Sequence, residues 1–419
     1  MSNVHLVPVA KPWLGEQEVE ASARVIRSGW VTQGPEVAAF EREFAEYVGS
    51  PHACAVSNCT TALHLALRVA GVGTGDEVIT VSHSYIATAN AIRHCGAIPV
   101  FVDIEPQCFN MDPQLLEAAI TLRTRAILCV HQIGNPCDLA AILTIAQRHG
   151  LPVIEDAACA IGSEILFDGQ WQKIGKPQAD VACFSFHPRK LLTTGDGGMI
   201  TTRRPQWDQR FRKIRQHSMS VSDVARHGSP EVVFESYPEL GYNYRMTDIQ
   251  AAVGRIQLKK LPAMIERRRQ QAKRYRELLG EISGLGLPEE KEWARPNYQS
   301  FCVRLPDGAD QRTVMQSMLD GGISTRRAVM CAHREPAFEI EPWKCGCASA
   351  PHKPGEPCGS LRISEAIQDT AIILPLFHEM TDAQQEQVAG ALGKACQHRS
   401  RRVSINLSNG TARHEQQEV

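Results

Sequence analysis

The sequence predicts an α/β protein in which a large, mostly parallel sheet is covered by helices on both faces and is followed by a smaller α+β domain. Short apolar runs alternate with helical patterns between residues 52 and 200, which is typical of parallel strands joined by crossover helices. A long helical pattern from residue 247 to 280 separates this region from a second group of strands and helices. The chain has 419 residues, of which 43% are hydrophobic and 22% charged. It can therefore bury a large core and is long enough for two domains.

The individual elements follow from apolar periodicity. The helical patterns Thr60–Val69 and Leu139–Arg148 each place apolar residues on one face. Pro262 is expected to interrupt the long helical region. The strands expected in the large sheet are His52–Val56, Glu77–Val81, Ile98–Asp103, Ala126–His131, Pro152–Glu155, Val181–Ser185 and Gly198–Thr202. In the second domain we expect strands at Gln299–Leu305 and Ile323–Thr325 and a helix at Asp382–Ala395.

These elements suggest three parts of the chain. Residues 1–264 form the large α/β domain together with an N-terminal segment, and residues 265–398 form the small C-terminal α+β domain. Residues 399–419 are polar and rich in Gln and Glu, which predicts a disordered tail.

Charge and composition exclude several classes of partner. The formal net charge is -1, which gives no electrostatic footprint for nucleic acid. The N-terminus has no signal-peptide pattern and the apolar runs are shorter than a membrane span, so a cytoplasmic protein without a membrane partner is expected.

The 14 cysteines are then expected to be reduced thiols, mostly inside apolar strands. One group of cysteines and histidines stands apart, in or near a segment rich in Pro and Gly. Its spacing matches no common zinc pattern, so we expect an irregular loop and no metal site. The group consists of Cys331, His333, Cys345, Cys347, His352 and Cys358.

Three motifs follow predicted strands, where a doubly wound sheet gathers ligand-binding residues. The first, Val56–Leu63, contains Thr60 and Thr61 at the start of a helix. Free backbone N–H groups and these hydroxyls suit a phosphate. Ordinary helix capping by Ser57 or Thr60 explains the same residues.

The second motif ends an apolar strand with Glu155 and Asp156. Strand alternation makes the two carboxylates face opposite ways, so only one needs to enter a site. A buried Asp156 would need a cationic partner, such as a protonated pyridine nitrogen, or would cap the next helix.

The third motif places Lys190 after the strand that ends at Ser185 and before the glycine-rich run Gly195–Gly198. A lysine held there can bond covalently to a carbonyl cofactor. We expect desolvation and neighbouring positive charge to lower its pKa.

Five strings in this order resemble the DegT/DnrJ/StrS family of pyridoxal-phosphate-dependent sugar aminotransferases, over about residues 12 to 395. They are SNCTTALHLAL, IEDAACAIGS, FSFHPRKLLTTGDGGMITT, LGYNYRMTDIQAAVGRIQL and LPLFHEMT. The resemblance implies the aspartate aminotransferase-like fold, the cofactor pyridoxal 5'-phosphate, and a homodimer with shared active sites.

By position in these motifs, the resemblance implies a role for each site residue. Lys190 holds the cofactor covalently, and the Asp156 carboxylate faces the pyridine nitrogen and keeps it protonated. Thr60, Thr61 and Ser185 bind the phosphate, Tyr85 stacks on the ring, and Asn243 reaches the phosphate in the partner's site. Arg245 binds substrate or holds its loop, and His83, His187 and His217 are further candidate contacts to the substrate, each of which is more often structural.

Two residues depart from the family pattern. Cys59 stands where many members carry Gly, and Cys159 replaces a Gln or His that supports the cofactor's ring hydroxyl. We therefore count Cys159 among the cofactor-binding residues and expect it to alter the chemistry of the lysine or the shape of the pocket.

The resemblance implies transfer of an amino group from glutamate or glutamine to a nucleotide-linked keto sugar by ping-pong steps. Amination of a keto-cyclitol is an alternative within the family. A cofactor-binding regulator without turnover is an alternative from another class, against which Lys190 and Asp156 argue. The presence of Lys190 also argues against the related dehydratases, which resemble this family but carry His at that position.

Overall fold

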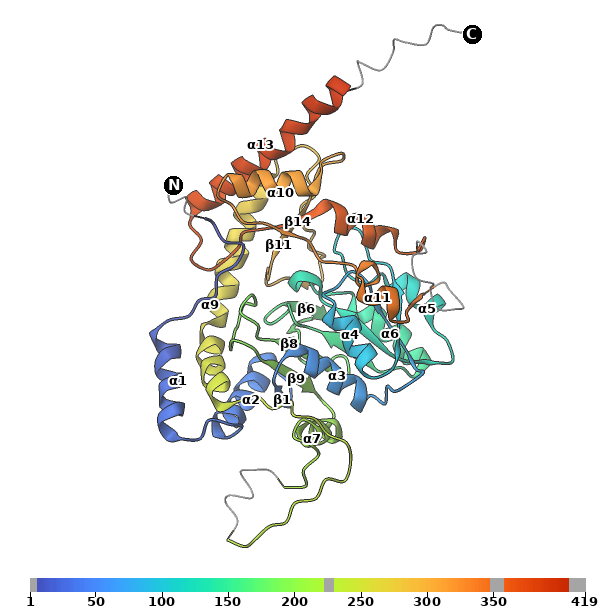
Figure 1. Cartoon of the computed structure of the whole chain (residues 1–419), viewed down its shortest axis with the longest axis vertical. Coiled ribbons are helices and arrows are strands. Elements are labelled where there is room, and N and C mark those ends of the chain that lie inside the picture. The colour runs from blue at the N-terminus through green and yellow to red at the C-terminus, as the bar shows by residue number, and fades with distance from the viewer. Residues whose placement is uncertain (1–5, 222–229, 347–357, 407–419) are drawn as a thin grey trace, which may run out of the picture.

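The computed structural model describes residues 6–221, 230–346 and 358–406, and a large sheet forms the centre of the molecule (Figure 1). The strand β9 is antiparallel to both of its neighbours, whereas every pairing from β8 to β13 is parallel. This confirms the predicted α/β class with a mostly parallel sheet. The strands lie in the order β1 (His52–Val56), β9 (Gly198–Thr202), β8 (Val181–Ser185), β5 (Val153–Asp156), β4 (Thr124–Val130), β2 (Glu77–Val81), β3 (Ile98–Val102) and β13 (Lys344–Cys345).

Helices cover both faces of this sheet because alternate strand residues point to opposite sides. In β1, Ala53 and Ala55 join one buried cluster, while Cys54 and Val56 join the other. The first cluster includes α2 (Pro35–Val48) and α6 (Leu139–His149), and the second includes α3 (Cys59–Val69), α4 (Ala87–His94) and α7 (Pro205–Ile214). Short helical turns lie at η1 (Pro113–Leu115), α5 (Leu116–Ala119) and η2 (Gln132–Gly134).

The helix α9 (Asp248–Leu279) connects the two halves of the molecule and runs without a break through Pro262. The expectation that Pro262 interrupts the helix is wrong. Thr247 and Gln250 form a capping box at its start, and the helix packs on α1 (Glu16–Ser28), α2 and α13 (Asp382–Asn406). This tertiary packing compensates for the backbone hydrogen bond that proline cannot donate.

The second half is built around a three-stranded antiparallel sheet and a buried cluster of its own. Its strands are β11 (Phe301–Arg304), β14 (Ala371–Leu374) and β12 (Arg326–Arg327), and its helices include α10 (Gln311–Asp320), α12 (Arg362–Thr370) and α13. A further small sheet contains β10 (Ala294–Arg295), β6 (Glu164–Phe167) and β7 (Gln170–Lys173). The predicted boundary between residues 264 and 265 falls inside α9 and stays a prediction.

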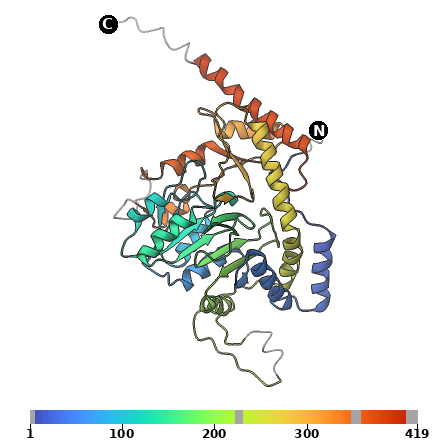
Figure 2. The ribbon, with the colours of Figure 1, turned by 180° about the vertical axis from the view of Figure 1, so that it is seen from behind.

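Figure 2 shows that α13 continues well beyond the body of the molecule. Residues 399–406 belong to this helix, whereas the sequence suggested a disordered tail from residue 399, which stays a prediction. A helix that packing has already formed adds further turns at little cost. The rest of the predicted tail, residues 407–419, lies outside the described residues.

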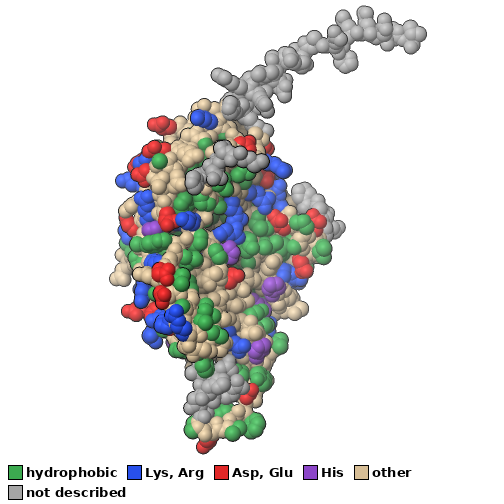
Figure 3. All heavy atoms as spheres, turned by 60° about the vertical axis from the view of Figure 1, so that its left-hand side comes forward, with side chains coloured by type: hydrophobic (Ala, Val, Ile, Leu, Met, Phe, Trp, Pro, Cys, Tyr) green, Lys and Arg blue, Asp and Glu red, His purple; other side chains and the backbone are tan. Residues whose placement is uncertain are grey.

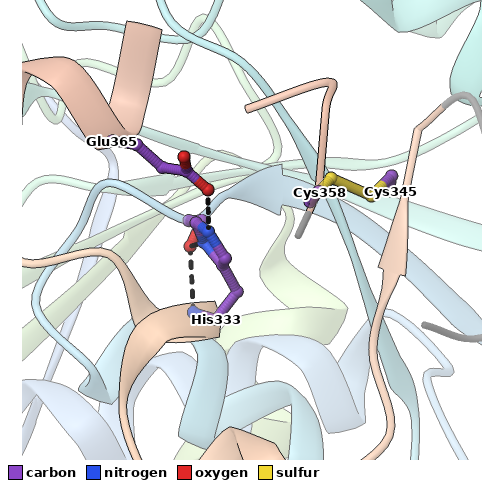
Figure 4. Close-up of a disulfide and its surroundings, with 5 residues drawn as sticks. His333, Cys345, Cys358 and Glu365 are labelled. Atoms are coloured by element: carbon purple, nitrogen blue, oxygen red, sulfur yellow. Dashed lines mark hydrogen bonds and ion pairs between the residues drawn. A yellow bond between two sulfur atoms is a disulfide. The ribbon is translucent and has the colours of Figure 1, made fainter. Parts of the chain in front are cut away.

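A C-terminal segment returns to the edge of the large sheet. It contains η3 (Ala332–Arg334), α11 (Ala337–Ile340) and the edge strand β13. Phe338, Trp343 and Leu361 pack with Phe101 of β3 in a separate buried cluster. The sulfur atoms of Cys345 and Cys358 are bonded to each other (Figure 4).

The expectation that all cysteines are reduced is therefore wrong for Cys345 and Cys358, because the returning segment brings these two side chains together. Cys347 and His352 lie outside the described residues. The other cysteines that the structure describes are free thiols.

On the face seen in Figure 3, basic and acidic side chains are interspersed. Among the helices of the described ranges, none is both long and apolar enough to cross a membrane.

Candidate active site

The candidate site lies at the carboxyl ends of two neighbouring parallel strands, β5 and β8. Asp156 is the last residue of β5 and pairs with Cys183 of β8. Lys190 follows β8 after a turn closed by a hydrogen bond from the Lys190 N–H to the His187 carbonyl, 2.8 Å long. The sheet therefore brings Lys190 and Asp156 to the same edge, where ligands of such folds bind.

The Asp156 carboxylate is buried and held by two donors. Its Oδ2 accepts a hydrogen bond of 2.7 Å from the Thr88 hydroxyl, and its Oδ1 accepts one of 3.1 Å from the backbone N–H of Ala158. Glu155 points to the other side, where its Oε2 lies 2.8 Å from His131 Nε2. The two carboxylates thus have separate partners, as the alternation along the strand predicts.

Lys190 is surrounded by groups that favour its charged form. Its Nζ donates to the Cys159 sulfur at 2.9 Å. Burial by itself lowers the pKa of Lys190, but the neighbouring Cys159, Asp156 and Cys59 outweigh burial and raise that pKa above its usual value. The expectation of a lowered pKa is wrong, because the groups next to the amine are sulfur and carboxylate rather than positive charges.

The two cysteines of the site differ in burial. Cys59 is 8% exposed, and its burial raises the pKa of the thiol well above its usual value. Its sulfur lies 3.6 Å from the carbonyl oxygen of Cys183. Cys159 is only partly buried, and the Asn297 amide donates to its backbone carbonyl at 2.8 Å. Cys59 is therefore a core residue, whereas Cys159 faces the lysine amine.

The turn before α3 supplies hydroxyls and backbone N–H groups. The Thr61 hydroxyl donates to the Asn58 carbonyl at 2.7 Å, and the Asn58 side chain accepts from the Thr61 N–H at 2.9 Å. Asn58 and Thr61 thus form the capping box of α3. The alternative interpretation of this motif, capping by Ser57 or Thr60, is wrong about the residues. Within the described part of the chain, the hydroxyls of Thr60 and Ser185 have no hydrogen-bond partner. These two side chains are therefore available to a ligand.

A glycine lets the strand β9 approach this turn closely. A Cβ on Gly198 would lie 2.6 Å from the carbonyl carbon and oxygen of Asn58. Any larger residue would push the turn away from β9, so Gly198 keeps the start of α3 at the sheet edge beside Ser185.

Tyr85 and Asn243 are exposed, and among the described residues neither is hydrogen-bonded to the side chain of Lys190 or Asp156. Tyr85 is 64% exposed and lies just before α4, so its ring is free to cover a ligand. The described residues 230–242, which follow α7 in the chain and are called the arm below, lead to Asn243, whose backbone bridges to Gln216 at the base of the arm. The Ser57 N–H donates to the Tyr244 carbonyl at 2.8 Å, which ties the base of this arm to the turn before α3.

The predicted substrate contacts are placed differently. His83 is fully buried and burial lowers its pKa to about 3, so it is a core residue and not a surface for substrate. His187 is partly buried, and burial and the adjacent Arg189 lower its pKa. His217 adopts a left-handed backbone conformation with φ of 61° at the base of the arm. Arg245 lies at the same base and is partly buried.

Three residues of the site were not foreseen, namely Thr88, Asn297 and Gln299. Gln299 accepts from the Leu191 N–H at 2.9 Å and donates to the Arg189 carbonyl at 2.6 Å, which fixes the turn that carries Lys190. No motif in the sequence marks these side chains, because their partners come from distant parts of the chain.

These groups fit the chemistry of pyridoxal phosphate. The Lys190 amine, which can bond covalently to the cofactor, lies near the buried Asp156 carboxylate, which can face the ring nitrogen. The unpaired hydroxyls of Thr60, at the start of α3, and of Ser185, at the end of β8, can bind the phosphate. Within the described ranges, no group of at least three His, Cys, Asp or Glu residues could hold a metal ion.

Comparisons with known proteins identify the family of the chain. The model of the DegT/DnrJ/EryC1/StrS aminotransferase family matches residues 12–393. The chain is 43% identical to the spore coat polysaccharide biosynthesis protein SpsC of Bacillus subtilis (strain 168) over 303 residues. These residues make up 72% of this chain and 77% of SpsC. DesV of S. venezuelae, solved in complex with a ketimine intermediate, is 35% identical with a TM-score of 0.79, over 91% of this chain and 94% of DesV.

A sugar aminotransferase described as putative, Spr1654 of Streptococcus pneumoniae, is 26% identical in its PMP form with a TM-score of 0.85, over 94% of this chain and 99% of Spr1654. It has also been solved in a PLP form. The predicted cofactor, pyridoxal 5'-phosphate, is thus confirmed for the family. The fold, the matched length and these relatives establish that the chain belongs to the DegT/DnrJ/EryC1/StrS aminotransferase family.

Proposed function

We propose that this aminotransferase moves an amino group from glutamate or glutamine to a keto sugar linked to a nucleotide, as a cytoplasmic homodimer with shared active sites. The observation that carries the proposal is the pair formed by Lys190 and Asp156 at one sheet edge. Relatives support a sugar as acceptor, because SpsC acts in polysaccharide biosynthesis and Spr1654 is described as a sugar aminotransferase.

Each residue of the site has a separate task in this proposal. Lys190 holds the cofactor through Nζ and, once the donor displaces it, moves the proton from the donor's α-carbon. The Asp156 carboxylate keeps a proton on the ring nitrogen, and the Thr88 hydroxyl holds that carboxylate in place. When bound, pyridoxal phosphate supplies a carbonyl carbon for the amino group and a ring that accepts the electron pair of the α-carbon.

The other residues hold and orient the cofactor. Thr60, Ser185 and the N-terminus of α3 bind its phosphate, and Tyr85 covers one face of its ring. Thr61 supports this turn and does not bind the phosphate directly, since both its hydroxyl and its backbone N–H are used in capping. Cys159 lies against the lysine amine and borders the ring.

The arm after α7 supports the homodimer. It exposes large apolar side chains that a monomer would leave in water, namely Val232, Phe234, Tyr237 and Leu240. We propose that this arm covers the partner subunit and carries Asn243 to the phosphate there. A two-fold dimer would then hold two complete sites.

The free thiols support the cytoplasmic location. Eleven described cysteines are unpaired, among them Cys159 in the site, and such thiols persist in a reducing compartment. The Cys345–Cys358 bond is the exception.

The experiment is a spectroscopic titration followed by an acceptor screen. The visible absorbance band of the lysine-bound cofactor is recorded, and L-glutamate or L-glutamine is added. Bleaching by one of them identifies the donor, and the bleached enzyme is then offered nucleotide-linked keto sugars and keto-cyclitols. The Lys190→Ala variant is the control that should form no such band.

Recovery of the band with a nucleotide-linked keto sugar supports the proposal. Recovery with a keto-cyclitol alone overturns the proposed acceptor in favour of the cyclitol alternative. No bleaching by either amino acid overturns the proposed donors.

A further inference from the structure

A segment of the C-terminal half lies along the turn that leads from β2 to Tyr85. The Ala332 N–H donates to the Ser82 carbonyl at 2.9 Å, and Cys331 pairs with His83 in an antiparallel bridge. This extra pairing holds the turn on its outer side, although the two segments are far apart in the sequence.

A chain of side-chain hydrogen bonds reinforces the pairing. The Ser82 Oγ lies 2.6 Å from His333 Nδ1, and His333 Nε2 lies 2.9 Å from Glu365 Oε1. Figure 4 shows Glu365 and His333 facing each other. Because a carboxylate can only accept, Nε2 carries a proton and donates it to Glu365. In the neutral ring Nδ1 then accepts from the Ser82 hydroxyl.

This order of serine, histidine and carboxylate also occurs in hydrolases, but the burial of Ser82 excludes that role here. Its side chain is 0% exposed, so no substrate carbonyl can reach it. Its oxygen also accepts from the His333 backbone N–H at 3.1 Å. Both its donor and an acceptor site are therefore used, and the hydroxyl is a fixed structural link.

The link acts on a turn whose backbone is also held by Gln132, which donates to the His83 carbonyl, and by the Thr88 N–H, which donates to the Tyr85 carbonyl at 3.0 Å. Tyr85 is 64% exposed, so its direction is set by the backbone that carries it rather than by packing around its ring. The Ser84 N–H donates to the Ser82 carbonyl at 2.8 Å, and the Ser84 hydroxyl lies 2.7 Å from the hydroxyl of Thr88. Ser82 is thus the point at which the C-terminal segment holds the residues that present Tyr85.

We propose that His333 is a positioning residue for the cofactor: by holding the Ser82 hydroxyl, it fixes the turn that presents the Tyr85 ring. This inference rests on the proposed role of Tyr85. If the link is lost, the turn must be ordered each time the cofactor binds, and the affinity for pyridoxal phosphate falls.

Two substitutions separate the two bonds of the histidine. His333→Asn keeps an acceptor near the place of Nδ1, within reach of Ser82, but loses Glu365. His333→Gln keeps a donor near the place of Nε2, within reach of Glu365, but leaves the buried Ser82 hydroxyl without its acceptor. The dissociation constant for pyridoxal phosphate is measured for both variants, together with the absorbance maximum of the bound cofactor and the thermal midpoint of the cofactor-free protein.

We expect His333→Gln to weaken cofactor binding about tenfold, because a turn without this link must be ordered when the cofactor binds, and His333→Asn to stay close to the wild type. Ser82→Ala removes the same link without changing the histidine and should match His333→Gln, including where His333→Gln folds poorly. The matched control is His149→Gln, since His149 pairs with Glu117 at the surface, 2.6 Å away.

The reference variant Tyr85→Ala distinguishes the two levels of the proposal. If it binds the cofactor as tightly as the wild type, the proposed role of Tyr85 fails and takes the role of His333 with it. If it binds weakly while His333→Gln and Ser82→Ala bind normally, only the positioning role is overturned. Equal weakening in His333→Asn and His333→Gln also overturns it, because the Ser82 bond would then not be the cause.

Discussion

Replacing Thr88 with valine tests how the structure maintains the carboxylate of Asp156. Thr88 is 1% exposed, and its hydroxyl donates to Asp156 Oδ2 at 2.7 Å. Valine has nearly the same shape, so the change removes the hydroxyl without opening a cavity. Asp156 keeps the Ala158 N–H, 3.1 Å away, but loses the shorter of its two hydrogen bonds.

The size of the effect follows from the charge on the acceptor. A hydrogen bond to a charged group contributes about 1.5–3 kcal/mol, and each 1.4 kcal/mol or so is a factor of about ten in rate. If this bond holds the carboxylate opposite the ring nitrogen, Thr88→Val should slow the reaction with the amino donor roughly 10- to 100-fold.

The assay is a single-turnover measurement of how fast the amino donor bleaches the visible band of the bound cofactor. Thr88→Ser is the matched control, because it keeps the hydroxyl and should retain most of the rate. A Thr88→Val variant that reacts within about twofold of the wild type, with the same amount of cofactor bound, would refute the reasoning.

Three further predictions concern the amine, the dimer and the buried histidines. Cys159 helps to raise the pKa of Lys190, so the Cys159→Ala variant should have more neutral amine at pH 7.5. It should therefore bind the cofactor covalently several-fold faster than the wild type at this pH, and the difference in rate should vanish toward pH 11. Stopped-flow absorbance measures both rates. The Lys190→Ala and Asn243→Ala variants should each be inactive alone. When equal amounts are refolded together, about a quarter of wild-type activity should return, because half the dimers then contain one complete site. Recovery below a few per cent would argue against active sites shared between subunits. Burial lowers the pKa of His64 to about 4 and that of His83 to about 3. In the unfolded chain both histidines take up protons below their usual pKa of about 6.5. Each histidine should therefore lower the free energy of unfolding by roughly 1–2 kcal/mol between pH 7 and pH 5. Urea unfolding should show that this free energy falls less in a His64→Gln variant than in the wild type.

The sequence could predict the sheet and the position of its ligand-binding edge because both depend on local patterns. The strands β1, β2, β8 and β9 have the predicted bounds, and β3, β4, β5 and β11 differ from the predicted bounds by one or two residues. The prediction of a strand at Ile323–Thr325 is wrong, because the strand of this region is β12, and the short strands β6, β7, β10 and β13 were not predicted. Apolar runs that end in polar residues locate strand ends, and parallel strands gather those ends at one edge. For this reason Lys190 and Asp156 could be placed together before any contact was known.

The contacts around these residues depended on tertiary structure and could not be predicted. Gln299 accepts a hydrogen bond from Leu191, next to Lys190, although the two residues are 108 positions apart in the sequence. The direction of the Lys190 pKa shift depends on Cys159 and Asp156 lying beside the amine, whereas a sequence shows only the charges adjacent along the chain. Helix packing explains in the same way why Pro262 does not end α9.

The Thr88 and His333 predictions concern two ends of one hydrogen-bonded path. His333 holds Ser82, the Ser82 carbonyl accepts from the Ser84 N–H, and the Ser84 hydroxyl contacts Thr88, which holds Asp156. If the path is continuous, His333→Gln loosens Ser84 and weakens the support of Thr88.

A double-mutant cycle tests this continuity. The combined Thr88→Val and His333→Gln variant should then lose less transition-state stabilisation than the sum of the single losses, by about 0.5 kcal/mol or more. The cycle compares single-turnover rates at saturating cofactor, so that differences in cofactor affinity do not enter. Strict additivity would mean that His333 supports only Tyr85 and that the carboxylate of Asp156 is maintained by Thr88 independently of the C-terminal segment.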